Sequence, residues 1–192
     1  LEFRRVLFRS VNGDGMDDIF IGGGRNQSSV LYISISSDKW KAVYQPFEAD
    51  YRSECVKAVF FDSDSDGDMD LYVANGGKTF SEFAPELHDI LYINDGKGNY
   101  TKSPALPFPS GICTGDIAIA DLDKNGLSDI VVCEHMKTGT YGLPGSVYIL
   151  YNEGNNRFRT ATPDGLGKLG MITSVVTMDV NEDGYEDLVM AG

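Results

Sequence analysis

The feature that most constrains this chain is an acidic stretch of nine residues that occurs four times. The clearest copy, residues 62–70, reads DSDSDGDMD, and related copies begin at Ser10, Asp121 and Asp179. Each copy has oxygen-bearing side chains at positions 1, 3, 5 and 9 and glycine at position 6. One copy alone is equally well explained as a solvated acidic turn. However, two carboxylates about 4 to 6 Å apart repel by roughly 1 to 4 kcal/mol, so four copies with one spacing favour a bound cation.

The spacing predicts loops that bind Ca²⁺. Side chains at alternate positions of a tight loop converge, the carbonyl of position 7 joins them, and glycine at position 6 permits a positive φ. Oxygen ligands without His or Cys suit Ca²⁺ best, and Mg²⁺ or Mn²⁺ less well. The candidate ligands are Asn12, Asp14, Met16 and Asp18 in the first loop, Asp62, Asp64, Asp66, Asp68 and Asp70 in the second, Asp121, Asp123, Asn125, Leu127 and Asp129 in the third, and Asp179, Asn181, Asp183, Tyr185 and Asp187 in the fourth. Ser10, where aspartate is expected, and Asn125 leave the occupancy of the first and third loops open.

The residues that follow each loop predict strands. An EF-hand needs a bidentate glutamate at position 12 of its loop, but Val73, Val132 and Met190 occupy that position. The helix-loop-helix interpretation therefore fails. The runs after the loops, such as Leu71–Ala74, are short and continuously apolar, which favours strands buried on both faces.

The loops recur with the period of a repeat protein. Their first residues lie 52, 59 and 58 positions apart, and each full unit carries a second hairpin, as around Asp95–Gly96. Four antiparallel strands per unit predict an all-β fold of β-propeller blades, with the acidic loops between the first and second strands. The predicted units are a partial blade at 11–48, complete blades at 49–107 and 108–166, and a truncated blade at 167–192. A closed ring then requires further blades of the same chain.

Residues 1–10 fit neither the repeat nor a signal peptide, because they contain no apolar segment of about 7 to 15 residues. Val6–Ser10 also match the translation of a common sequencing-adaptor end. We therefore expect residues 1–10 to be an adaptor or cloning artefact.

Two segments carry a family resemblance. The segments AVFFDSDSDGDMDLYVANGG and ILYINDGKGNYTKSPALP resemble FG-GAP or VCBS repeat proteins, most closely the branch with cartilage acidic protein and the ASPIC/UnbV proteins. The resemblance covers about residues 11–192. It implies a calcium-bearing propeller of the integrin α type that is extracellular or periplasmic and without established catalysis.

The charge of the chain excludes some partners. Its net charge is −13, and 16 of its 29 acidic residues lie in the four loops. Nucleic acids need Lys and Arg for their phosphates, so we expect no nucleic-acid binding. An anionic membrane surface is disfavoured for the same reason, and no apolar stretch is long enough to span a bilayer.

The face opposite the acidic loops is the predicted ligand surface, because the longer connections gather there. These connections contain Phe80, Phe83, His88, His135 and Tyr141, which suit a protein or glycan ligand but also simply cover the blade ends.

No catalysis is expected. The candidate acid-base cluster is Cys133-Glu134-His135, with His88-Asp89 elsewhere. Adjacent strand residues point to opposite faces, so the three members of the cluster cannot converge without a bend. The leading hypothesis is an extracellular, cell-surface or periplasmic module for ligand binding or adhesion. A structural scaffold, or part of a larger secreted enzyme, are the alternatives.

Overall fold

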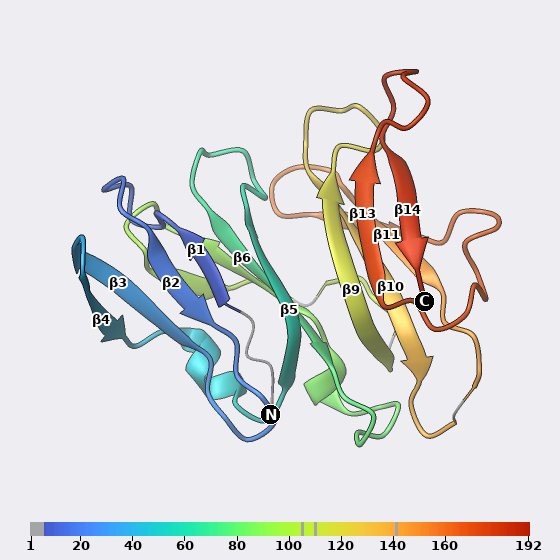
Figure 1. Ribbon diagram of the computed structural model, residues 1–192, viewed down its shortest axis with the longest axis horizontal. Helices are drawn as coiled ribbons and strands as arrows, with labels where there is room; N and C mark the ends of the chain where they lie inside the picture. Colours follow the sequence, from blue (N-terminus) through green and yellow to red (C-terminus); the bar gives the residue numbers. More distant parts are fainter. Residues whose placement is uncertain (1–5, 105, 110, 141) are drawn as a thin grey trace.

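The computed structural model describes residues 6–104, 106–109, 111–140 and 142–192. Within these ranges the chain forms four antiparallel sheets and two short 3-10 helices (Figure 1). The first sheet holds β1 (Val6–Arg9), β2 (Asp18–Ile21), β3 (Val30–Ser36) and β4 (Lys39–Val43), the second β5 (Glu54–Phe61), β6 (Asp70–Gly76), β7 (Ile90–Asn94) and β8 (Tyr100–Lys102), the third β9 (Ile112–Ala120), β10 (Asp129–Lys137), β11 (Val147–Asn152) and β12 (Phe158–Ala161), and the fourth β13 (Ser174–Met178) and β14 (Asp187–Ala191). The helices are η1 (Pro46–Asp50) and η2 (Pro85–Leu87). Neither has the length or apolar character to cross a bilayer, and the same holds throughout the described ranges.

Each sheet is a meander in which every strand pairs with its neighbour in sequence. The register places an acidic loop at the tip of each first hairpin. The pairs that close these loops are Arg9–Asp18, Phe61–Asp70, Ala120–Asp129 and Met178–Asp187. The predicted all-β fold of propeller blades, with the loops between first and second strands, is confirmed.

Neighbouring sheets share apolar layers. On β6, Leu71 packs in the layer that contains Phe20 of the first sheet, whereas Tyr72 packs in the layer that contains Ile130 of the third. A further layer, which includes Val175, lies between the third and fourth sheets. Because successive side chains of a strand point to opposite faces, β6 is buried on both sides, as its continuous apolar run predicts.

The first sheet differs from the predicted partial blade. β1 pairs with β2 along its whole length, so this sheet has four strands and begins at Val6 rather than at residue 11. The physical reason is that β2 otherwise presents an unpaired edge, which an extended segment of almost any sequence can cover. Residues 1–5 lie outside the described residues, and the artefactual origin of residues 1–10 stays a prediction.

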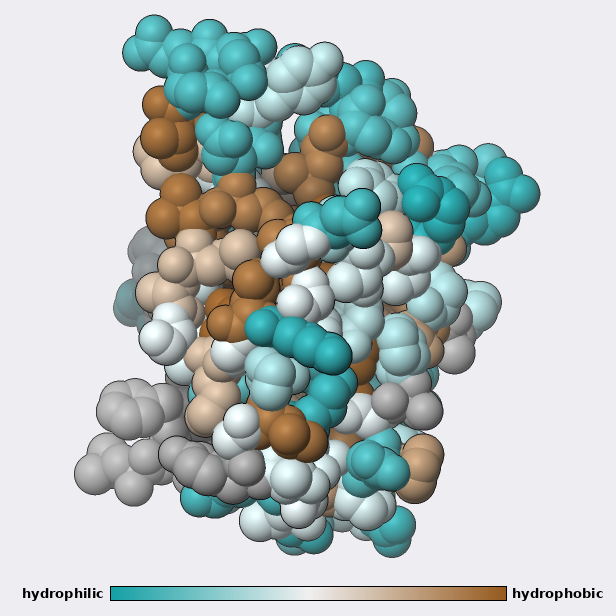
Figure 2. All heavy atoms as spheres, turned by 90° about the vertical axis from the view of Figure 1, so that its right-hand side faces the viewer, coloured by the Kyte–Doolittle hydropathy of each residue, from teal (hydrophilic) through white to brown (hydrophobic). Residues whose placement is uncertain are grey.

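The fourth sheet contains two strands, and one of its faces is bare. Val175 is buried against the third sheet, whereas Val176, Met178 and Val189 are 51%, 50% and 44% exposed. Figure 2 shows hydrophobic residues reaching the surface on this side of the molecule, below the hydrophilic loop tips. Such a face is typical of a contact surface.

Candidate metal sites and the opposite face

Two left-handed positions shape each acidic loop. Glycine at position 6 has φ of 77°, 93°, 84° and 82° in the four loops, as predicted. Position 4 also has positive φ, and the residues there are Gly13, Ser65, Lys124 and Glu182. Because three of these carry side chains, the second left-handed position is not visible from the glycine pattern.

Position 1 holds the turn closed. Asp62, Asp121 and Asp179 accept the N–H of the glycine at position 6 at 3.0, 2.9 and 2.7 Å. The hydroxyl of Ser10 accepts the N–H of Gly15 at 3.0 Å. Serine therefore keeps the shape of the first loop but not its charge.

Position 9 fastens each of the first three loops to the third strand of its own sheet. Asp70 is fully buried, and its two oxygens accept the N–H groups of Ser63 and Asn94 at 3.0 and 2.8 Å. Asp18 and Asp129 each form the equivalent bonds at 2.9 and 2.8 Å. Burial raises the pKa of Asp70 and of Asp129. These aspartates are thus structural anchors as well as candidate ligands.

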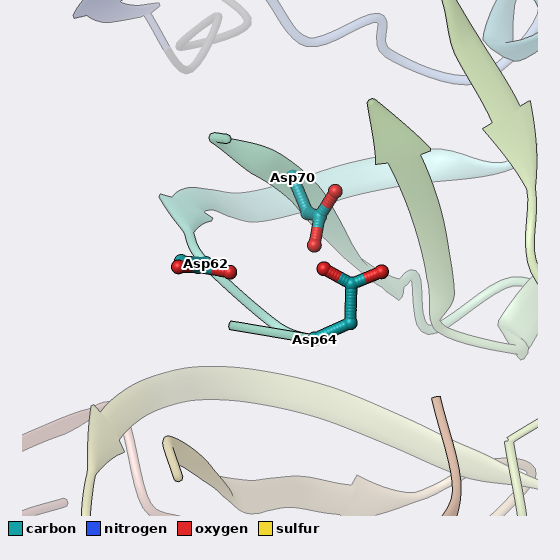
Figure 3. Close-up of side chains that lie close together, drawn as sticks. All are labelled: Asp62, Asp64 and Asp70. Atoms are coloured by element: carbon teal, nitrogen blue, oxygen red, sulfur yellow. The ribbon is translucent and has the colours of Figure 1, made fainter. Parts of the chain in front are cut away.

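Two loops gather three carboxylates each. The trios are Asp62, Asp64 and Asp70 in the second loop and Asp121, Asp123 and Asp129 in the third, and within each trio one oxygen per residue lies within 4.8 Å of the others. Figure 3 shows the carboxylates of Asp64 and Asp70 facing each other. Such clusters can hold a hard cation, for which carboxylate oxygens are the preferred ligands.

The second loop also contains an unsatisfied oxygen. Asp64 Oδ1 is buried and has no hydrogen-bond partner among the described residues. Burial without a partner costs about 1 to 3 kcal/mol. Negative charge is also concentrated in this loop, because desolvation and then Asp66, Asp62 and Asp64 raise the pKa of Asp68. The residues of this loop therefore fit a cation.

The remaining predicted ligands turn toward their own backbone. At position 5, Asp14, Asp66, Asn125 and Asp183 accept the N–H of position 7 at 2.8, 2.9, 2.8 and 2.8 Å. Position 7 is Met16, Asp68, Leu127 and Tyr185, whose main-chain carbonyls stay predicted ligands.

The first and fourth loops differ from the other two at position 3. There, Asn12 and Asn181 accept the N–H of position 5 at 3.1 and 2.9 Å. Asp187 accepts the N–H of Val180 at 3.0 Å. In the described residues the first and fourth loops form no carboxylate trio, because each has asparagine at position 3 and the first also has Ser10 at position 1.

Two asparagines link neighbouring sheets at the loops. Asn94, at the end of β7, donates to the carbonyl of Val11 in the first loop at 2.7 Å, and Asn152, at the end of β11, donates to that of Ser63 in the second, also at 2.7 Å. Both side chains are buried. Neither asparagine is among the predicted site residues, although a strand-final asparagine repeats after 58 residues.

The opposite face carries a pocket of about 530 Å³. Its walls are residues 49–50 and 52–53, residues 85–91 around η2, and residues of β8, of β9 and of the connection between them. In Figure 1, η1 and η2 lie at the end of the sheets away from the acidic loops. The pocket is therefore on the predicted ligand face, and its lining combines apolar Leu87, Leu106 and Phe108 with polar Arg52 and His88.

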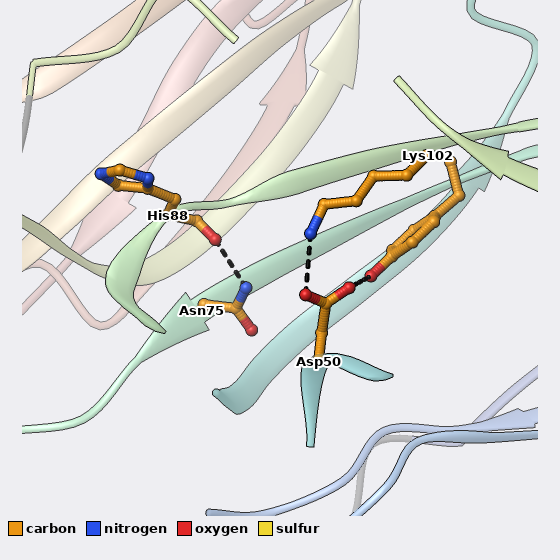
Figure 4. Close-up of polar contacts among 5 residues, drawn as sticks. Asp50, Asn75, His88 and Lys102 are labelled. Atoms are coloured by element: carbon orange, nitrogen blue, oxygen red, sulfur yellow. Dashed lines mark hydrogen bonds and ion pairs between the residues drawn. The ribbon is translucent and has the colours of Figure 1, made fainter. Parts of the chain in front are cut away.

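An ion pair forms part of the pocket wall. Lys102 Nζ lies 2.7 Å from Asp50 Oδ1, and the Tyr92 hydroxyl donates to Asp50 Oδ2 at 2.6 Å (Figure 4). Asn75 donates to the carbonyl of His88 at 2.7 Å, while the His88 ring points away from the Asp50–Lys102 pair. The wall is thus fixed by hydrogen bonds.

The pocket lining includes a buried carboxyl group. Asp89 accepts the N–H of Asn75 at 2.7 Å and the hydroxyls of Tyr72 and Thr114 at 2.8 and 2.9 Å. Burial raises the pKa of Asp89 to about 7, and these hydrogen bonds offset only part of the effect. The group joins β6, β7 and β9.

The predicted ligand-face aromatics fall into different environments. Phe80 is buried beside Leu87 and Cys113, so it belongs to the core, whereas Phe83 is 73% exposed. His88 is exposed and lines the pocket. Tyr141 lies outside the described residues.

The Cys133-Glu134-His135 cluster does not converge. Glu134 is buried and accepts hydrogen bonds from Lys137 and Ser146 at 2.8 and 3.1 Å, and a ring nitrogen of His135 lies 3.3 Å from the carbonyl of Ile172. The side chains of Glu134 and His135 therefore bind different partners and do not contact each other through these bonds.

Repeated four-stranded sheets with acidic loops at one end define a protein of the β-propeller class. The FG-GAP-like repeat family matches residues 11–73, 62–132 and 139–190, so this chain belongs to that family. The match does not distinguish the branch with cartilage acidic protein and the ASPIC/UnbV proteins from the rest of the family, so membership of that branch stays a prediction. No curated protein matches the chain.

Among solved structures, the fold is similar to a lectin from Agrocybe aegerita, described for its specific recognition of non-reducing terminal N-acetylglucosamine. The TM-score is 0.67 and the identity 18%, over 99% of this chain and 47% of the lectin. This chain thus spans less than half the length of that protein.

Proposed function

We propose that this chain is part of a calcium-stabilised propeller that binds a protein or glycan ligand outside the cytoplasm, without catalysis. The observation that carries the proposal is the pocket of about 530 Å³ on the face opposite the acidic loops. One face then serves stability and the other recognition.

The carboxylate trios and the unpaired Asp64 Oδ1 support the calcium part of the proposal. Bound Ca²⁺ would neutralise each loop and lock the angle between its first and second strands. Loops of this kind in extracellular modules bind Ca²⁺ with Kd as weak as about 0.1 to 1 mM. Such affinity suits the extracellular space, the cell surface or the periplasm, where FG-GAP repeats typically occur.

The pocket favours ligand binding over a purely structural scaffold. Pockets of about 300 to 1,000 Å³ with apolar walls and few polar groups are typical of ligand sites. The similar lectin makes glycans the first class to test. The dispersed partners of Glu134 and His135 support a non-catalytic role, and the bare face with Val176 and Met178 supports contact with further blades of the same chain.

A glycan array and a peptide library, each probed with the 192-residue chain in CaCl₂, test the proposal. We expect at least one ligand whose binding falls about tenfold or more in Arg52→Ala and His88→Ala. Phe83→Ala is the matched control, because Phe83 is exposed on the same face but does not line the pocket.

Binding that survives both pocket variants but is lost in Phe83→Ala would move the ligand site to the exposed aromatics. No binding in either library would leave the scaffold alternative.

A further inference from the structure

The hairpin between β11 and β12 reaches across to the second acidic loop. Asn156 Nδ2 donates to Asp64 Oδ2 at 3.2 Å. Asn156 Oδ1 also lies 3.4 Å from the hydroxyl of Ser63, whose closer acceptor is the Asp70 carboxylate. Asn156 belongs to the third sheet, whereas Ser63 and Asp64 occupy positions 2 and 3 of the loop in the second. The third sheet thus contacts the side chains of a candidate metal site, in addition to the Asn152 bond to the loop backbone.

The contact with Asn156 gives Asp64 different hydrogen-bond partners from those of the position 3 residues in the other loops. In the other three loops, the position 3 residues Asn12, Asp123 and Asn181 accept the N–H of position 5 at 3.1, 3.2 and 2.9 Å. Asp64 Oδ2 instead accepts from Asn156, and Asp64 Oδ1 is left buried without a hydrogen-bond partner. The Asp64 carboxylate is thus oriented by a hydrogen bond to Oδ2, and Oδ1 remains free to bind a cation.

The equivalent hairpin of the second sheet has no such side chain. Counting four residues from the strand-final asparagines Asn152 and Asn94 gives Asn156 and Gly98, with φ of 57° and 79°. Gly98 lies against the first loop, since a Cβ placed on it would be 3.5 Å from Asn12 Cβ. The loop that faces asparagine has a carboxylate trio, and the loop that faces glycine has none among the described residues.

We propose that Asn156 is a positioning residue for a cation in the second loop, so that one blade binds the ion and the next blade orients the ligand Asp64. The inference rests on the calcium site proposed above. Partners that orient a metal ligand typically change metal affinity 10- to 100-fold. Because the contact crosses between sheets, occupancy of the loop also strengthens the junction of the second and third blades.

Backbone NMR of the full chain during a Ca²⁺ titration separates the loops, because each has its own reporter amide at position 6. The test variant is Asn156→Gly, and the matched control is Asn155→Gly. Both residues have positive φ, 57° and 54°, which glycine adopts without strain, and Asn155 is exposed. We expect the Kd read from Gly67 to rise about tenfold or more in Asn156→Gly and to stay within about twofold in the control. The Kd read from Gly126 should not change in either variant.

A second variant, Asn156→Asp, keeps the size of the side chain but replaces the NH₂ donor with a carboxylate oxygen, which cannot donate to Asp64 when ionised. We expect it to alter the Kd at Gly67 without altering that at Gly126. An unchanged Kd at Gly67 in Asn156→Gly overturns the inference while leaving the calcium proposal intact. No Ca²⁺-dependent shift at Gly67 in the unmodified chain overturns both.

Discussion

Asn152 donates its side-chain amide to the carbonyl of Ser63, 2.7 Å away, and so joins the third sheet to the acidic loop of the second. The same amide also lies 3.2 Å from the carbonyl of Ser128, and its oxygen accepts the N–H of Gly154 at 2.9 Å. One buried side chain thus satisfies main-chain groups from two sheets. This makes the junction between blades polar at the loop end and apolar in the middle.

Replacing Asn152 should therefore destabilise the chain. We expect Asn152→Ala to lower the free energy of unfolding by about 2 to 4 kcal/mol, because buried main-chain groups lose their partners. Urea unfolding in EDTA measures this cost without a contribution from calcium. The control is Asn99→Ala, which removes an exposed bond to Asp95 and should cost about 0.5 kcal/mol or less. Equal costs for the two variants would contradict the role of Asn152.

Calcium should raise the thermal stability of the chain in proportion to the number of occupied loops. With Kd of about 0.1 to 1 mM, about 10 mM CaCl₂ adds roughly 1.4 to 2.7 kcal/mol per occupied loop. We expect a higher Tm in CaCl₂ than in EDTA, and a smaller increase in Asp62→Asn/Asp64→Asn. Asp38→Asn, an exposed change outside the loops, is the control and should keep the full increase. A Tm that is the same in both buffers would argue against metal binding.

The sequence predicted those parts of the molecule that depend on local spacing. The hairpin at residues 62–70 follows from glycine at position 6 and from the flanking apolar runs, and the structure closes it between Phe61 and Asp70. The trio of Asp62, Asp64 and Asp70 follows from the same spacing.

Contacts between distant segments could not be predicted in this way. The bond from Asn156 to Asp64 joins residues 92 positions apart, and no local pattern specifies which side chain faces a loop across two sheets. β1 was missed for another reason. Its pairing with β2 depends on an available sheet edge more than on the composition of residues 6–9, and most of its side chains are exposed.

Asp89 should make stability depend on pH. Because its folded pKa is about 7 and the unfolded value is about 3.9, the folded state holds the proton more tightly. The stabilisation by this group is full below the unfolded pKa and is lost as the pH rises through about 7. In EDTA, the free energy of unfolding of the unmodified chain, relative to that of Asp89→Asn, should fall by about 1 to 3 kcal/mol from pH 5 to pH 8. Urea unfolding at several pH values gives this difference. A difference that is constant over the range would show that Asp89 does not titrate there.

Placing aspartate at position 1 should give the first loop a metal site. Ser10 already closes the turn from position 1, because its hydroxyl accepts the N–H of Gly15 at 3.0 Å. Ser10→Asp therefore adds a negative charge to a loop that already has the required shape. The single tryptophan, Trp40, reports on this loop, because its indole N–H donates to the carbonyl of Asp17 at 3.1 Å. We expect a saturable change in Trp40 fluorescence on Ca²⁺ addition in Ser10→Asp, with an apparent Kd at least about tenfold lower than in the unmodified chain. Ser10→Asn, which lacks the charge, is the control. If it responds as strongly as Ser10→Asp, the shape of the loop and not its charge limits binding.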